Sequence, residues 1–189
     1  SINMITMNAN NILDYLKENQ KRISETAEIT ELDELAFARI SYLPFHKIKK
    51  QLDLTKRNFK ISEIAEAMKS LSISDFAWPD DEKFIQLLGK SPRFQNLKVG
   101  FFVRKNDKKL EKQFSAVTIP INFFTMYVSF FGTAGTLFGW KDAFNMSILS
   151  EIPAQREALE YLKHISRRYF YNNFYLGGHS KGGNLSIYS

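Results

Sequence analysis

The sequence predicts an α/β protein, in which helices cover both faces of a β-sheet and a helical N-terminal region precedes the sheet. Apolar residues recur at helical spacing over residues 1–90, and they alternate as in strands through the middle of the chain. A strand–helix–strand–helix pattern near the end predicts a parallel sheet. The length of 189 residues favours one domain with a small helical addition. We divide the chain into a helical region, 1–90, and a sheet-containing core, 91–189.

Two helices are predicted in the first 45 residues. The first lies within Asn11–Arg22, where apolar residues recur at helical spacing. The second follows Thr30, which forms a capping-box pattern with Asp33. Pro44 ends it, because proline disfavours helical geometry in the residue before it.

Two more helices are predicted before residue 91. A further apolar stripe follows the helical repeat, and it consists of Ile61, Ile64, Ala65, Met68 and Leu71. A short helix covers Asp81–Leu88, with Gly89 as its C-terminal cap. Core packing is the simplest role for these stripes, and a lid or partner-binding face is the alternative.

The middle of the chain changes to the period of β-strands. Strands are predicted over Lys98–Lys105, Gln113–Ile119 and Phe123–Phe131, separated by a turn at 106–108 and a break at 120–122. A helix begins near Pro153, a short strand covers Phe174–Leu176, and the last residues begin another helix.

Composition excludes several classes of protein. The chain has no cysteine, which excludes a disulfide scaffold, a zinc ribbon and thiol catalysis. No metal-ligand constellation and no cofactor motif is visible. The net charge is +6, but the Lys/Arg clusters at 47–50, 56–57 and 105–112 lack interleaved aromatic residues, so we expect no nucleic-acid partner. Peripheral contact with an anionic membrane is an open alternative.

A cytoplasmic location is expected, because the first residues show no secretory signal. The uncharged stretch Phe114–Trp140 is long enough to cross a bilayer. It contains Pro120, Asn122 and several glycines, however, and its Val/Ile/Phe/Tyr content predicts strands broken by turns. The oligomeric state is not predicted.

The segment 178–182, Gly-His-Ser-Lys-Gly, is a Gly-x-Ser-x-Gly motif between a predicted strand and a predicted helix. This is the context of a nucleophile elbow, in which a sharp turn exposes a serine hydroxyl. Ser180 is the candidate nucleophile, and Gly178 and Gly182 leave room for strand and helix to approach. The backbone N–H of Lys181 is a candidate oxyanion donor. The simpler alternative is a glycine-rich turn with an idle serine.

A second candidate oxyanion donor lies at the end of the strand predicted up to Phe131. There the chain continues as Gly132-Thr133 into a glycine-rich loop. Hydrolases of this architecture take a second donor from a loop after an earlier strand, and Thr133 would supply it. Trp140 and Phe144 are candidates for an acyl pocket, although such residues more often pack a helix on a sheet.

The elbow sequence resembles that of class 3 lipases and, more closely, a family of uncharacterised lipase-like bacterial proteins of the α/β-hydrolase fold. Three further segments carry the resemblance: 41–43, 139–146 and 153–155. It implies a serine esterase or lipase acting on a small-molecule or lipid ester, with Ser180 as nucleophile and the Thr133 and Lys181 amides as oxyanion hole. The chain departs from the family pattern at Phe131 and Ala134, where the family has arginine and aspartate.

The acid and base of a catalytic triad are not found after Ser180, although this fold places them there. The histidines, His46, His164 and His179, all precede it. We expect sequence beyond residue 189 to supply the acid and the base, so that this chain is the N-terminal part of a longer hydrolase. The alternative is a catalytically inactive binding or scaffolding protein of the same fold.

Overall fold

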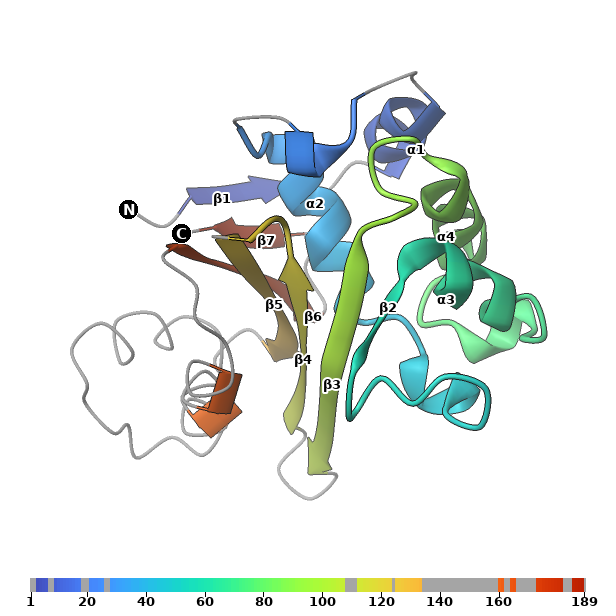
Figure 1. Cartoon of the computed structure of the whole chain (residues 1–189). Coiled ribbons are helices and arrows are strands. Elements are labelled where there is room, and N and C mark those ends of the chain that lie inside the picture. Colours follow the sequence, from blue (N-terminus) through green and yellow to red (C-terminus); the bar gives the residue numbers. More distant parts are fainter. Residues whose placement is uncertain are drawn as a thin grey trace.

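A computed structural model describes residues 3–6, 9–17, 21–25, 28–107, 112–123, 125–133, 160–161, 164–165, 173–181 and 185–188. Its helices are α1 (Ala9–Lys17), α2 (Glu31–Ile40), α3 (Ile61–Met68) and α4 (Asp80–Lys90), with 3-10 turns at Ile23–Glu25, Phe45–Ile48 and Ile73–Asp75. The strands are β1 (Asn3–Thr6), β2 (Asn58–Lys60), β3 (Lys98–Asp107), β4 (Lys112–Pro120), β5 (Thr125–Thr133), β6 (Asn173–Lys181) and β7 (Leu185–Tyr188). The chain therefore has a mixed α/β fold (Figure 1).

The strands form one sheet in the order β1-β7-β6-β5-β4-β3-β2. Among the strands that the structure describes, only β5 and β6 pair in parallel, and the other neighbouring pairs are antiparallel. The prediction of a parallel sheet was therefore wrong for most of it. Short connections join β3 to β4 and β4 to β5, and these allow only antiparallel neighbours, whereas the long stretch between β5 and β6 allows a parallel crossover.

Helix α2 packs on one face of the sheet, and buried serines tie it there. Ser129 of β5 donates its hydroxyl to the carbonyl oxygen of Phe37 at 2.7 Å, and Ser115 of β4 donates to that of Ser41 at 2.7 Å. The predicted capping box is confirmed: the Thr30 hydroxyl accepts from the Asp33 amide, and the Asp33 carboxylate accepts from the Thr30 amide. The start and the end of α2 are thus both fixed.

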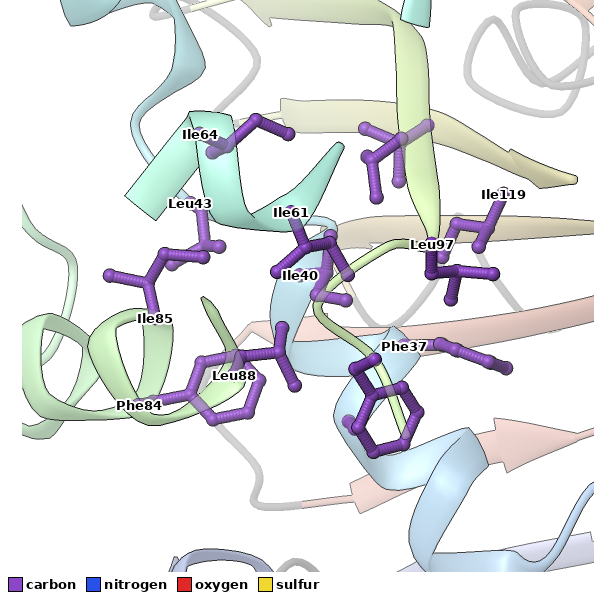
Figure 2. Packing of buried hydrophobic residues seen from close by; sticks show 14 of the residues in the cluster. Phe37, Ile40, Leu43, Ile61, Ile64, Phe84, Ile85, Leu88, Leu97 and Ile119 are labelled. Carbon is purple, nitrogen blue, oxygen red and sulfur yellow. The ribbon is translucent and has the colours of Figure 1, made fainter. Parts of the chain in front are cut away.

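Helices α3 and α4 pack beside α2 and complete the main hydrophobic core. Figure 2 shows this packing, in which side chains from the three helices meet residues of the sheet and its flank. The labelled members are Phe37, Ile40, Leu43, Ile61, Ile64, Phe84, Ile85, Leu88, Leu97 and Ile119. The predicted stripe of the third helix is confirmed as buried from Ile61 to Met68.

Gly89 was predicted to be the C-terminal cap of the fourth helix. That prediction was wrong, because Gly89 lies inside α4, which continues to Lys90. Its role is close packing: a Cβ at Gly89 would lie 2.5 Å from the Cβ of Ala65 on α3. The two helices therefore approach more closely than any larger residue at this position allows.

On the opposite face of the sheet, the helical residues 160–161 and 164–165 include Tyr161, which packs against β5. Tyr161 packs its ring edge-on against Phe130 of β5, with centroids 6.2 Å apart, and donates its hydroxyl to the carbonyl oxygen of Phe101 at 2.8 Å. Tyr161 and Ile165 are buried, as predicted for the helix that follows Pro153. Pro153 itself lies outside the described residues.

A β-bulge interrupts β3 between Gly100 and Val103. Phe101 adopts a left-handed backbone there, with φ of 49°, which is costly for a bulky residue. The amide of Phe102 leaves the sheet ladder and donates to the carbonyl oxygen of Leu54 at 2.8 Å. The bulge therefore redirects the strand next to two cavities that Phe102 lines.

The uncharged stretch that begins at Phe114 forms β4 and β5 as far as Thr133, as predicted. Within the described part of the chain, no helix has the length and apolar character needed to cross a membrane.

Candidate functional site

The carboxyl ends of β5 and β6 bring the predicted catalytic segments together. The parallel register places Gly132 opposite Ser180 and Thr133 opposite Lys181. Because parallel neighbours point their carboxyl ends to the same edge, the candidate nucleophile and both candidate oxyanion residues lie at one edge of the sheet. Ligands of open α/β sheets bind at this type of edge.

The strand–turn–helix context predicted for the elbow is not what the structure shows. Ser180 and Lys181 continue β6 as paired strand residues, and Leu185–Tyr188 forms the strand β7 in place of the predicted helix. β7 pairs with both β6 and β1. The physical reason is strand pairing: the backbone groups of β6 are paired with β5, and those of β7 with β6 and β1, which a helix over 185–188 would not allow.

The remaining predicted residues divide into two groups. Gly178 lies in β6, between Phe130 of β5 and Ile187 of β7. Gly182, Trp140 and Phe144 lie outside the described residues.

An aromatic cavity of about 420 Å³ adjoins the end of β5 on the α2 side of the sheet. Phe131, directly before Gly132, forms one wall, and Tyr42 and Trp78 form another. The Tyr42 ring lies 4.4 Å from that of Trp78 and 4.9 Å from that of Phe131, measured between centroids. Leu43, Ala77, Phe102 and Phe114 also contribute to the apolar lining. We call this space the aromatic cavity.

The elements around α2 and α4 position these rings. Tyr42 directly follows Ser41, the C-cap of α2, and Trp78 lies in the turn that leads into α4. A buried ion pair joins the two helices, with Arg39 Nη2 and Asp81 Oδ1 2.8 Å apart. Burial raises the pKa of the Tyr42 phenol, and the negative charge of Asp81 raises it further. Tyr42 is therefore a neutral hydroxyl at physiological pH.

A second cavity, of about 350 Å³, shares Phe102, Arg104 and Asn106 with the aromatic cavity. His46, Lys49 and Asp53 also line it, and we call it the basic cavity. Nη1 of Arg104 lies 3.2 Å from Nδ1 of His46.

The His46 ring in the basic cavity is held neutral. Its pKa is lowered by burial first, then by the charges of Arg104 and Lys47, while Asp75 acts in the opposite direction. A neutral ring nitrogen accepts the hydrogen bond that Arg104 can only donate. This contact positions the Arg104 guanidinium beside both cavities.

Sequence reasoning missed both cavities, although one signal for the aromatic cavity was present. Phe131 follows Tyr127 and Ser129 by even steps along β5, which places all three on the α2 face of the sheet. The partners Trp78 and Arg104 come from a turn and a strand far away in sequence, and no spacing rule joins them. In the described part of the chain, no group of His, Asp and Glu side chains could hold a metal ion.

Comparison with known proteins gives one match. A family model described as Mbeg1-like matches residues 88–189, which is more than half of the chain and includes β3 to β7. No curated protein matches, and no solved structure matches.

Proposed function

The chain belongs to the Mbeg1-like family, and we propose that it is a serine hydrolase of the esterase or lipase type with an α/β-hydrolase-like core. The observation that carries the proposal is the register of β5 and β6, which sets Gly132-Thr133 beside Ser180-Lys181 at the carboxyl edge of two parallel strands. The Gly-x-Ser-x-Gly sequence at 178–182 supplies the residue types that this chemistry needs.

In this proposal the Ser180 Oγ attacks the acyl carbonyl carbon of an ester. The carbonyl oxygen becomes an oxyanion, and the backbone N–H groups of Thr133 and Lys181 donate hydrogen bonds to it. A general base accepts the serine proton and returns it to the leaving alcohol, and water then releases the acid from the acyl-enzyme. As the order of catalytic residues in this fold suggests, the acid and base would come from sequence beyond residue 189.

Two structural features support the assignment of the core. The long crossover between β5 and β6 contains helical residues at 160–161 and 164–165, and Tyr161 packs against Phe130 of the sheet, as expected for the connection that a parallel pair requires. The aromatic cavity lies next to the end of β5, where an apolar acyl group would be held. The expected partner is therefore a small-molecule or lipid ester.

A fluorophosphonate probe tests the proposal, because it labels only serines that are activated as nucleophiles. We expect labelling of the full-length wild-type protein, which includes the sequence proposed to supply the acid and the base, and complete loss of labelling in full-length Ser180→Ala. The matched control Ser70→Ala removes an exposed hydroxyl from the turn after α3, and it should label like the wild type. Absence of labelling in the wild type, or labelling that survives in Ser180→Ala, contradicts the proposal.

A second candidate function is ligand binding or scaffolding without turnover. The observation that favours it is that Ser180 lies in a paired strand and not at a turn. This candidate predicts thermal stabilisation by an ester ligand without its hydrolysis, and no labelling by the fluorophosphonate.

A further inference from the structure

Two adjoining cavities of different character meet at Arg104. Five aromatic residues contribute to the lining of the aromatic cavity, and the basic cavity carries Lys49 and the neutral His46. Phe102, Arg104 and Asn106 belong to both linings, so the two spaces are neighbours along one surface. A ligand that occupies both would have an apolar part and a polar part.

The volumes and the lining fit a small amphipathic molecule. About 420 Å³ in the aromatic cavity lies in the range of small-molecule sites, which are commonly ~300–1,000 Å³. Tyr42, Trp78 and Phe131 offer ring faces and edges to an alkyl chain, and its burial there would remove apolar surface from water. These rings suit an alkyl chain better than a charged or strongly hydrated group, because such a group loses hydration against apolar surface.

The charges of the basic cavity favour an anion. Arg104 and Lys49 contribute two positive charges, and His46 is held neutral. Asp53 adds one negative charge, which interacts with Lys49 and accepts hydrogen bonds from the backbone N–H and the hydroxyl of Thr55, so the lining of the basic cavity carries a net charge of +1. The nearby Lys47 is paired with Asp75 at 2.9 Å, so neither adds a free charge.

Arg104 suits the recognition of an oxyanion better than a lysine would. Its planar guanidinium donates two parallel hydrogen bonds to a phosphate or carboxylate. The contact with His46 uses Nη1 alone, which leaves the other guanidinium nitrogens available to a ligand in the basic cavity.

We propose that the two cavities together bind a single-chain amphiphile with an anionic head group, with the alkyl chain in the aromatic cavity and the oxyanion at Arg104. This inference goes beyond the proposed function and does not require Ser180 to be reactive. It defines the ligand class by its chemistry, an alkyl or acyl chain ending in a phosphate or a carboxylate.

Binding of dodecyl phosphate below its micelle concentration tests the proposal. Trp78 lines the aromatic cavity, so titration of the intrinsic fluorescence reports occupancy, and calorimetry gives the stoichiometry. We expect one molecule per chain, and dodecanoate should bind to the same site. Dodecyltrimethylammonium should bind at least about tenfold more weakly, because it carries the opposite charge on the same chain. Octyl phosphate should also bind at least about tenfold more weakly, because it buries fewer methylene groups.

Two variants test whether the charge of Arg104 binds the head group, without a change in the fold. Arg104→Gln should weaken dodecyl phosphate about tenfold and should not weaken dodecyltrimethylammonium, because the variant removes a charge that attracts the anion and repels the cation. Because Arg104 is exposed, this variant should keep the wild-type melting temperature. Lys83→Gln removes an exposed charge from α4, away from both cavities, and should bind like the wild type.

The outcomes are distinguishable from a failure of the proposed function. Ser180→Ala should bind dodecyl phosphate with wild-type affinity, even if the fluorophosphonate labels nothing. Equal binding of the cationic and anionic detergents, or unchanged binding in Arg104→Gln, overturns the proposal. Binding of inorganic phosphate as tightly as dodecyl phosphate would also overturn it, because the alkyl chain would then contribute nothing.

Discussion

Glu34 is an acidic residue placed where its charge is unfavourable. It lies on α2 beneath the sheet, and the Tyr127 hydroxyl is 3.4 Å from its Oε1. Burial raises the pKa of Glu34 from 4.5 to about 7, the hydrogen bond from Tyr127 lowers it, and the charges of Glu31 and Asp33 raise it further. The folded protein therefore holds a proton on Glu34 at pH values at which the unfolded chain has released it.

The sign of the pH dependence follows from this difference in proton binding. Between the unfolded pKa of 4.5 and the folded value of about 7, the native state binds more protons, so the free energy of unfolding falls as the pH rises. Glu34→Gln removes the free-energy cost of ionising this buried carboxyl group. After allowance for partial solvent screening, we expect a gain of about 1–2 kcal/mol at about pH 8 and little change at about pH 5.

Urea unfolding at the two pH values measures this effect. Glu25→Gln, at an exposed 3-10 turn, is the control and should change stability by less than about 0.5 kcal/mol at either pH. A gain of the same size at both pH values would show that the variant acts through something other than the ionisation of Glu34.

At the scale of elements, Gly89 sets the distance between α3 and α4. Gly89→Ala places a methyl group 2.5 Å from the Cβ of Ala65, closer than real Cβ atoms approach. Alanine gains about 1 kcal/mol over glycine in helix propensity, but overpacking in a core costs typically about 1–3 kcal/mol. We expect a net loss of stability in thermal or urea unfolding.

A second substitution distinguishes steric overlap from other causes. Ala65→Gly destabilises by itself, but combined with Gly89→Ala it should restore part of the lost stability, because the methyl group then moves from one helix to the other. Additive losses in the double variant would contradict the assignment of Gly89 as a packing residue.

The helices were predictable because their signals are local. The Thr30–Asp33 pair marks the start of α2, and the stripe from Ile61 to Met68 marks α3, and both patterns depend only on residues a few positions apart. The strands of the middle region followed from alternation in the same way.

The C-terminal elements were not predictable by the same reasoning. In Leu185–Tyr188 the apolar residues alternate with polar ones, which is a strand signal, but the preceding Gly-x-Ser-x-Gly motif favoured a helix. What decides the outcome is pairing: β7 lies between β6 and β1, and β1 comes from the first residues of the chain. A contact across almost the whole length of the sequence leaves no local pattern.

At the scale of the whole molecule, the predicted helical region, 1–90, and the predicted sheet-containing core, 91–189, share one hydrophobic core. The cluster joins residues of α1 to α4 with Val99, Val117, Ile119 and Tyr127 of the sheet. A buried ion pair between Asp33 of α2 and Arg93 after α4 also crosses the boundary. Neither part would keep its apolar surface covered if the other unfolded.

We therefore expect the two parts to unfold in a single cooperative transition. Far-UV circular dichroism and tryptophan fluorescence should give the same midpoint in urea. Phe37→Ala should lower both midpoints together and reduce the free energy of unfolding by about 3–5 kcal/mol. The reason is that Phe37 is fully buried between α2 and the sheet, with its ring centroid 4.6 Å from that of Tyr127.

Ile73→Ala is the matched control, since Ile73 is 57% exposed, and it should change the free energy of unfolding by no more than about 0.5 kcal/mol. Two separate transitions, or a Phe37→Ala variant in which only one probe shifts, would show that the helical region folds independently of the sheet.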